Sequence, residues 1–336
     1  MAKEIKQWKD IEERFTDGLI LGNGASIAVH EGFSYGGLFS EARRLKFLGE
    51  DAERVFQQFQ VNDFELVLRH LWHSKVVFNA LRLAGEPVDR VNTAYIAVRT
   101  ALIQTVRSTH VSYDDALPHL EHIYKFLRRF KTVLSLNYDL IVYWAAQYGN
   151  SALGSNYHFK DCFEATRRFS EDWGTKRQPY RGVADPTLYF YPHGNLALVR
   201  ELDERERKVV VGQHGQLLDN ILGLWESGEC VPLFVCEGVS ENKKAAIDRS
   251  SYLARVYREV IPSLGDSLVV YGWGLAEQER HIVEQVMRHR PRRVAISIRQ
   301  SNKALMRRAE EVFEDRGYEL VFFDSDSPGA WNHALD

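Results

Sequence analysis

The chain has 336 residues, of which 45% are hydrophobic and 26% charged, an ordinary composition for a globular protein. Its 43 Lys and Arg against 46 Asp and Glu leave a formal net charge of −3, so the basic excess of nucleic-acid-binding proteins is missing and we expect no direct nucleic-acid binding. Three cysteines are too few for a disulfide framework or a four-cysteine zinc site. The charged N-terminus resembles no signal peptide and no apolar stretch is long enough for a membrane span, so we expect a cytoplasmic protein without membrane binding.

The first predicted strand is the short apolar run at residues 17–22, which ends in a glycine and is typical of a buried strand. Strand signals then almost vanish, and apolar residues recur at helical spacing instead. Asn62 and Glu65 have the spacing of a capping box at the start of one of these helices. We therefore predict an all-helical insertion over residues 37–130. Its expected helices cover residues 38–47, 52–59, 64–83, 91–106 and 116–130.

Strand signals return after this insertion and alternate with helical segments. Continuous apolar strands that alternate with helices predict a parallel sheet covered on both faces. We therefore predict an α/β fold, a Rossmann-like sheet built from residues 1–36 and 131–336, with the helical insertion after its first strand. The expected strands cover residues 132–136, 188–191, 208–211, 232–236, 267–271, 293–298 and 319–323. The expected helices cover residues 140–148, 241–259, 277–290 and 303–316.

A glycine-containing loop, Gly22-Asn23-Gly24-Ala25-Ser26, directly follows the first predicted strand. Glycines at this position let the backbone approach a phosphate closely, although they also suit a tight strand-to-helix turn without a ligand. Ile27 stands where the dinucleotide fingerprint GxGxxG has its third glycine, and no acidic residue ends a second strand about twenty residues later. These departures disfavour a hydride-transferring dehydrogenase. The chain also lacks the GxxxxGK[ST] phosphate loop, which disfavours ATP hydrolysis.

Polar residues follow two later strands. Asn137 and Asp139 come directly after the strand at 132–136, where ligands of parallel sheets bind, although such residues also cap helices. His193, followed by Gly194, closes the strand at 188–191 and is a candidate general base, with a structural turn histidine as the alternative.

A fourth segment, Tyr271-Gly272-Trp273-Gly274, again follows a predicted strand. Its glycines suit a backbone-lined nucleotide contact or an ordinary turn. Glu279 and His281 lie early in the next helix, where the helix dipole alone accounts for an acidic residue.

The four segments GNGAS, SLNYD, YPHGN and YGWG, in this order and all at strand ends, resemble the sirtuin-type NAD-binding family. Sirtuins carry a GAGxS-type loop, a TQNxD-type segment, a catalytic HG and a late glycine-containing nucleotide loop. The resemblance covers residues 17–30, 131–150, 188–196 and 265–325, and leaves the helical insertion unmatched.

The chain departs from the protein deacylases of this family in two respects. Three cysteines cannot supply their four-cysteine zinc module, and Leu136 stands where they have glutamine. The SLNYD form is closer to sirtuin-like effectors of bacterial antiviral defence, which hydrolyse NAD, have a helical insertion and lack the zinc module. Such effectors assemble as oligomers or pair with a second protein that senses infection.

The resemblance implies that NAD is the substrate and that no metal is required. The implied catalytic residues are Asn137 and Asp139 near the nicotinamide end and His193 as general base. The implied NAD-binding residues are Gly22, Asn23, Gly24, Ser26, Gly194, Gly272 and Gly274.

The leading prediction is a glycohydrolase that cleaves the nicotinamide–ribose bond of NAD, with a role in antiviral defence by NAD depletion. A non-catalytic sensor of NAD or ADP-ribose would use the same strand ends, and an NAD-dependent protein deacylase is the third alternative. The partners implied are NAD, further copies of the chain and a second defence protein that triggers activity. The helical insertion would either contact such partners or cover the site.

Overall fold

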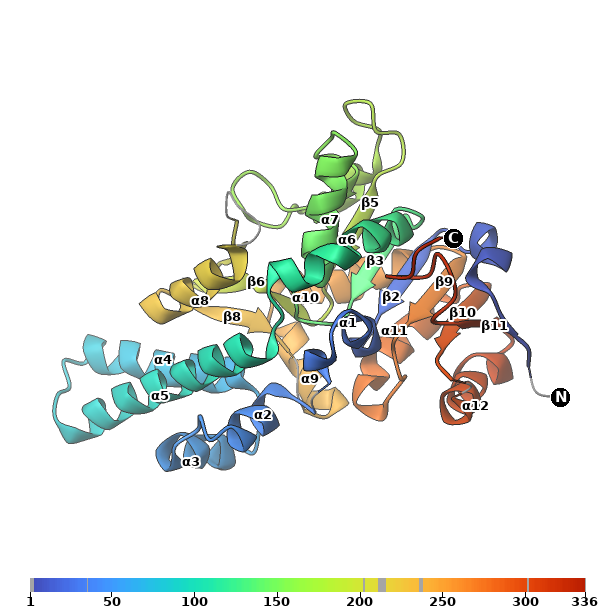
Figure 1. Ribbon diagram of the computed structural model, residues 1–336. Helices are drawn as coiled ribbons and strands as arrows, with labels where there is room; N and C mark the ends of the chain where they lie inside the picture. The colour runs from blue at the N-terminus through green and yellow to red at the C-terminus, as the bar shows by residue number, and fades with distance from the viewer. Residues whose placement is uncertain are drawn as a thin grey trace.

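The computed structural model describes residues 3–34, 36–201, 203–210, 216–235, 238–300 and 302–335. Its centre is an eight-stranded, all-parallel sheet in the order β1-β11-β10-β9-β2-β3-β5-β4 (Figure 1). The predicted fold class, a Rossmann-like α/β sheet, is therefore confirmed. The strands are β1 (Ile5–Lys6), β2 (Gly18–Leu21), β3 (Thr132–Ser135), β4 (Phe159–Lys160), β5 (Thr187–Phe190), β9 (Ser267–Tyr271), β10 (Arg293–Ile298) and β11 (Glu319–Asp324).

The four strands β2, β3, β5 and β9 form the middle of this sheet, and every one of their residues is buried. β2 lies between β3 and β9, so that Ile20 pairs with Leu134 on one side and Val270 on the other. Apolar side chains on both faces of a strand require cover on both faces of the sheet. The parallel arrangement also brings the carboxyl ends of these strands to one edge.

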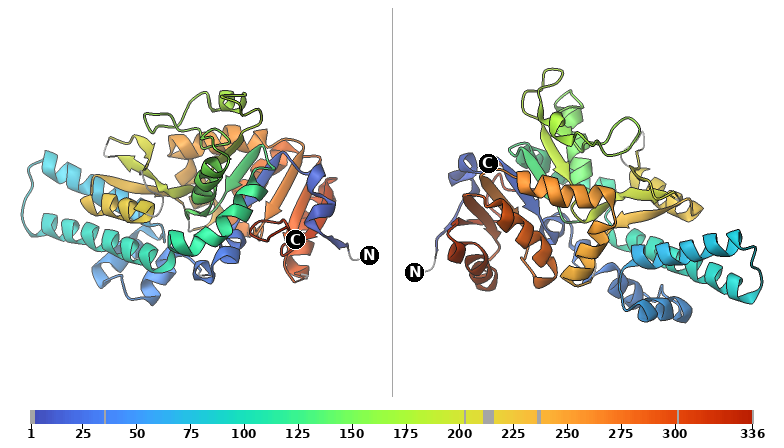
Figure 2. Two further views of the ribbon diagram at one scale, coloured as in Figure 1. Left: turned by 45° about the horizontal axis from the view of Figure 1, so that its top comes forward. Right: turned by 180° about the vertical axis from the view of Figure 1, so that it is seen from behind.

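Helices supply this cover. In Figure 1, α6 lies over the near face of the sheet, and the orange helices that follow residue 250 lie over the opposite face in the right view of Figure 2. The flanking helices are α1 (Asn23–Val29), α6 (Tyr113–Leu127), α7 (Ile141–Ala152), α9 (Ser240–Asp248), α10 (Ser251–Arg255), α11 (Arg280–His289) and α12 (Lys303–Val312). None of the described helices is both long and apolar enough to cross a membrane.

Between β2 and β3, the regular elements of the described residues are all helices. α4 and α5 form a long pair that projects away from the sheet, whereas α6 packs against α7 beside it (Figure 1). The helices of this segment not yet given are α2 (Leu38–Arg44), α3 (Glu50–Phe59), α4 (Phe64–Ala80) and α5 (Glu86–Thr109). Aromatic rings join α2, α3 and α4, with centroid distances of 4.7 Å between Phe39 and Phe56 and 5.1 Å between Phe56 and Phe64.

The predicted cap of α4 is wrong by one residue. Asp63, not Asn62, is the N-cap, and its carboxylate accepts the backbone N–H groups of Glu65 at 2.9 Å and Leu66 at 3.2 Å. A carboxylate at the N-cap satisfies orphan donors of the first turn and also suits the helix dipole.

A second, three-stranded antiparallel sheet corrects another expectation. The segments expected at 208–211 and 232–236 do not join the parallel sheet: β7 (Glu206–Lys208) and β8 (Cys230–Phe234) pair with β6 (Gly194–Glu201). A short turn joins β6 to β7, and such a turn produces an antiparallel pair rather than a crossover. α8 (Leu217–Ser227) packs on this sheet, and Val211 and Cys236 lie outside the described residues.

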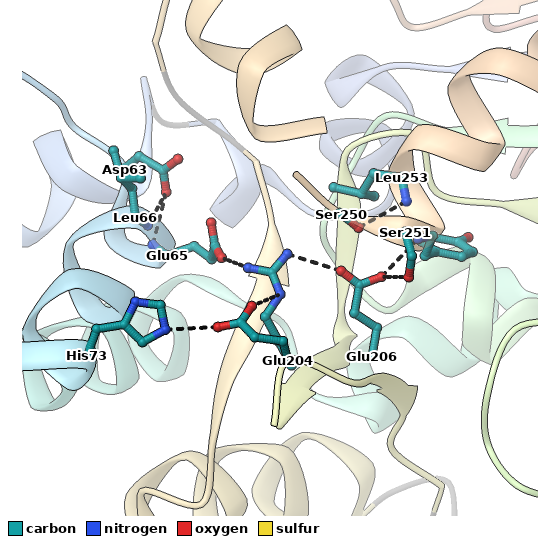
Figure 3. Close-up of polar contacts among 11 residues, drawn as sticks. Asp63, Glu65, Leu66, His73, Glu204, Glu206, Ser250, Ser251 and Leu253 are labelled. Carbon is teal, nitrogen blue, oxygen red and sulfur yellow. Dashed lines mark hydrogen bonds and ion pairs between the residues drawn. The ribbon is translucent and has the colours of Figure 1, made fainter. Parts of the chain in front are cut away.

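A buried ion cluster fastens the helical pair to the small sheet, as Figure 3 shows. Arg200 of β6 donates to Glu65 of α4 at 2.6 Å and to Glu206 of β7 at 3.0 Å. The second oxygen of Glu206 accepts from Ser251 Oγ and from the Tyr252 N–H, both at 2.8 Å. We call Glu65, Arg200 and Glu206 the arginine cluster; it ties α4, the β6–β7 hairpin and α10 together.

Candidate functional site

A cavity of about 740 Å³ opens at the carboxyl ends of β2, β3, β5 and β9. This volume falls within the range of small-molecule sites in proteins. All four segments singled out in the sequence contribute to its wall, through Gly22, Asn23, Gly24, Asn137, Asp139, His193, Gly272 and Gly274. Among the predicted site residues, Ser26 and Gly194 lie behind this wall and do not line it.

The glycines of the first and fourth segments pack against each other. Gly24 donates its N–H to the Gly272 carbonyl at 2.8 Å, and Gly22 donates to the Tyr271 carbonyl at 3.0 Å. A Cβ on Gly24 would lie 2.8 Å from the Gly272 backbone, and Gly272 has a φ of +65°. These glycines therefore bring two strand-end loops into contact, and both N–H groups are already used by backbone carbonyls.

Gly274 and Gly194 differ in their surroundings. A Cβ on Gly274 would meet no atom within 4 Å, so packing does not require a glycine there. A Cβ on Gly194, whose φ is +79°, would lie 2.2 Å from the Leu233 carbonyl oxygen. Gly194 thus lets the first residue of β6 pack directly against β8, and it faces β8 instead of the cavity.

The Asn137 side of the cavity is a closed hydrogen-bond network. Asn137 Nδ2 donates to the Gly22 carbonyl at 3.0 Å and to Ser26 Oγ at 2.8 Å. Ser26 Oγ in turn donates to Asp139 Oδ2, and Asp139 Oδ1 accepts the Ile141 N–H at 2.9 Å. Asn137 Oδ1 receives no hydrogen bond from the described residues. The network therefore fixes the amide plane of Asn137 and leaves its carbonyl oxygen as the atom that can serve a ligand.

Asp139 has a structural position within this network. Its side chain is only 4% exposed, and burial raises the pKa of its carboxyl while the hydrogen bonds from Ser26 and Ile141 lower it. Asn195, which the sequence analysis did not single out, donates to the Asp139 carbonyl oxygen. Both oxygens of the carboxylate accept hydrogen bonds within the protein, and these bonds hold the Asp139 side chain in place.

His193 and Glu279 also line the cavity, and His281 lies against His193 outside the cavity wall; we call these three residues the histidine cluster. His193 Nε2 lies 2.9 Å from His281 Nε2 and 3.3 Å from Glu279 Oε2. Lys243 of α9 donates to the other Glu279 oxygen, Oε1. Glu279 Oε2 is buried and accepts no hydrogen bond from the described residues.

The surroundings of both histidines favour the neutral ring. Burial lowers the pKa of His193 well below its ordinary value, the Lys243 charge lowers it further, and a hydrogen bond with the Leu136 backbone opposes both. Burial, followed by the neighbouring His193, lowers the pKa of His281 to about 3. A neutral imidazole can accept a proton, and the carboxylate of Glu279 is placed to stabilise the imidazolium that would result.

The sequence predicts His193 as a site residue but does not predict its neighbours. Glu279 and His281 were noted only as early helix residues, and Lys243 and Ser240 carried no signal at all. Spacing along the chain does not reveal them, because α9 and α11 reach His193 through tertiary packing.

Comparison with known proteins gives one positive result. No curated protein matches the chain. A family model matches residues 19–331, a stretch that includes every cavity-lining residue, the helical insertion and the small antiparallel sheet. The chain belongs to this family, which is described as a domain of unknown function (DUF4917).

Proposed function

We propose that the chain is an NAD glycohydrolase that cleaves the nicotinamide–ribose bond to give nicotinamide and ADP-ribose. The observation that supports this proposal is the shared cavity of Asn137 and His193, with the Gly22–Gly24 loop and Gly272 in the same wall. These are the segments on which the resemblance to zinc-free sirtuin-like NAD hydrolases rests, and ligands of parallel sheets bind at this edge.

Asn137 would position the attacking water. Its Nδ2 is committed to Gly22 and Ser26, so its Oδ1 can accept a hydrogen bond from water or from a ribose hydroxyl. The glycosidic bond breaks through an oxocarbenium-like state, and the positive pyridinium nitrogen takes the bonding electron pair and leaves as neutral nicotinamide. Fixed placement of the water beside the ribose carbon C1′ would lower the barrier by avoiding loss of translational freedom during the reaction.

His193 would accept the proton that the attacking water loses as its oxygen bonds to C1′. The neutral ring offers the necessary lone pair, and Glu279 Oε2, 3.3 Å from Nε2, would stabilise the charged ring. Proton transfer of this kind contributes about 10²–10⁴-fold to a rate. His193 then releases the proton to solvent, so that NAD and water give nicotinamide, ADP-ribose and one proton.

The test is incubation of the purified chain with NAD, with nicotinamide and ADP-ribose followed by chromatography. We expect both products from the wild type and a decrease of about 10²–10⁴-fold for His193→Ala and for Asn137→Ala. His73→Ala removes an exposed histidine on α4 that pairs with Glu204 and serves as the control. Full turnover by a folded His193→Ala variant would contradict the assignment.

A sensor function gives a different result in the same assay. NAD would then bind to the wild type without release of nicotinamide, and His193→Ala would retain binding. The role in antiviral defence, oligomer formation and a second defence protein rest on the family resemblance alone, and protein deacylation is disfavoured by the missing zinc module.

A further inference from the structure

Three ligand-type atoms of the histidine cluster converge on one point. His193, Glu279 and His281 each offer one ligand-type atom, and these three atoms lie within 4.8 Å of one another, although the residues come from three different places in the fold. His193 follows β5, Glu279 ends the short helix at Glu277–Glu279, and His281 is the second residue of α11. Two imidazoles and a carboxylate are a common ligand set for Zn²⁺ and related transition ions.

Within the cluster, the two Nε2 atoms and Glu279 Oε2 lie close together with few hydrogen-bond donors among them. His193 is bonded to the Leu136 backbone, and Ser240 Oγ lies 3.1 Å from His281 Nδ1, so both rings are held at a second point. The two Nε2 atoms therefore face each other at 2.9 Å with at most one proton between neutral rings. Glu279 Oε2 beside them is a buried acceptor without a hydrogen-bond donor among the described residues.

We propose that His193, Glu279 and His281 bind a divalent transition-metal ion of the Zn²⁺ class. Tetrahedral coordination with bonds of 2.0–2.2 Å separates neighbouring ligand atoms by about 3.4 Å. The two separations from His193 Nε2, 2.9 Å to His281 Nε2 and 3.3 Å to Glu279 Oε2, lie close to this value, so small side-chain shifts complete the site. The ion takes the place of the proton shared by the two rings.

The surroundings provide the outer shell and an approach to the site. Ser240 Oγ orients His281, and metal-bound histidines generally hold such a partner at their other nitrogen. Lys243 donates a hydrogen bond to Glu279 Oε1, so Glu279 would bind the ion through Oε2 alone. The positive charge of Lys243 would lower the affinity for a cation. A second cavity of about 550 Å³ is lined by Ser240 and His281, so the cluster lies between two cavities.

Metal binding has a functional consequence that rests on the proposed function. A metal ion on His193 Nε2 occupies the lone pair that the general base uses. Zn²⁺ therefore inhibits NAD hydrolysis, and a chelator restores it. The resemblance to zinc-free NAD hydrolases implies a reaction without a metal ion, so we expect the site to be regulatory.

Calorimetric titration of the purified chain with ZnCl₂ tests the proposal. We expect one ion per wild-type chain at this site, at least about 100-fold weaker binding in His281→Gln, and about 10–100-fold weaker binding in Ser240→Ala, which removes only the outer partner. His73→Gln, which alters an exposed histidine beside a glutamate, is the matched control and should bind as the wild type does.

Equal Zn²⁺ binding by the wild type, His281→Gln and Ser240→Ala would overturn the proposal. Thermal melting of each metal-free variant establishes that it is folded, and Ser240→Ala keeps the test open if His281→Gln does not fold. The titration measures binding and not turnover, so its failure is distinct from a failure of NAD hydrolysis. In the activity assay, a wild-type hydrolase that Zn²⁺ does not inhibit would contradict the inhibitory role.

Discussion

The arginine cluster and the histidine cluster are both buried, and both join elements from distant parts of the chain. In the arginine cluster each carboxylate has donors: Arg200 serves Glu65 and Glu206, and the second oxygen of Glu206 accepts from α10 (Figure 3). In the histidine cluster one carboxylate oxygen, Glu279 Oε2, has no donor among the described residues, and two Nε2 atoms face each other. The polar atoms of the arginine cluster are therefore used in joining elements of the fold, whereas the histidine cluster keeps atoms that can bind a ligand or a proton.

Their positions agree with this difference. The arginine cluster lies between the helical pair and the small sheet, whereas His193 and Glu279 line the cavity. Buried polar groups are normally satisfied, and an exception at a cavity wall is a frequent mark of a functional site. We therefore expect a variant of the arginine cluster to lower stability more than activity, and a variant of the histidine cluster to lower activity more than stability.

The largest expected effect on stability is that of Arg200→Ala. It leaves two buried carboxylates uncompensated, and we expect the free energy of unfolding in urea to fall by roughly 3–5 kcal/mol. Arg205→Ala removes exposed ion pairs with Glu201 and Asp203 and should cost less than about 1 kcal/mol. Arg200→Ala that remains folded should hydrolyse NAD at close to the wild-type rate. Equal losses of stability in the two variants would contradict the structural role of the arginine cluster.

A second effect concerns the pH dependence of stability and involves His110, a buried histidine outside the histidine cluster whose two ring nitrogens both have hydrogen-bond partners. His110 Nδ1 lies 2.8 Å from the Val111 carbonyl, and Nε2 accepts the Leu140 N–H at 3.0 Å. Burial lowers the pKa of His110 to about 4, against an ordinary value of 6.5. As the pH falls below 6.5 the unfolded chain binds the proton first, so stability is full above pH 6.5 and falls by up to roughly 3 kcal/mol by about pH 4.

Unfolding measured across this pH range for wild type and His110→Gln isolates the contribution. The glutamine can still accept from Leu140 but does not titrate, so the variant should lose less stability between pH 6.5 and 4 than the wild type. Parallel curves for the two proteins would show that His110 is not the group responsible.

The fold was largely predictable, and the exceptions have physical reasons. Strands such as β9 are continuous apolar runs that are buried on both faces, and this pattern made the parallel sheet predictable from the sequence. β6 was missed because it begins with Gly194 and carries the buried Arg200, whose charge is compensated by carboxylates from outside the strand: Glu65, Glu204 and Glu206. A two-residue strand such as β1 leaves too short a pattern to detect.

The candidate site was predictable only where its residues follow predicted strands. Asn137 and His193 directly follow apolar strands, and parallel strands place such residues at a common edge. Lys243 and His281 lie in helices whose contact with each other and with His193 depends on packing, and no local pattern records that contact. The function of Glu279 was obscured by an adequate local explanation, the helix dipole.

The smallest effect that we predict concerns Ser26→Ala, in the satisfied network on the Asn137 side. The variant removes the donor to Asp139 Oδ2 and one acceptor of Asn137 Nδ2, while Ile141 still serves Asp139 Oδ1 and Gly22 still holds Asn137. An unsatisfied buried acceptor costs about 1–3 kcal/mol, and the remaining bonds place the expected loss of stability at the lower end of that range. Ser40→Ala, which removes an exposed hydroxyl from the start of α2, is the matched control. Because Asn137 Oδ1 then loses part of its restraint, NAD turnover should fall by less than in Asn137→Ala, and an equal fall in both variants would assign to Ser26 a direct role in the chemistry.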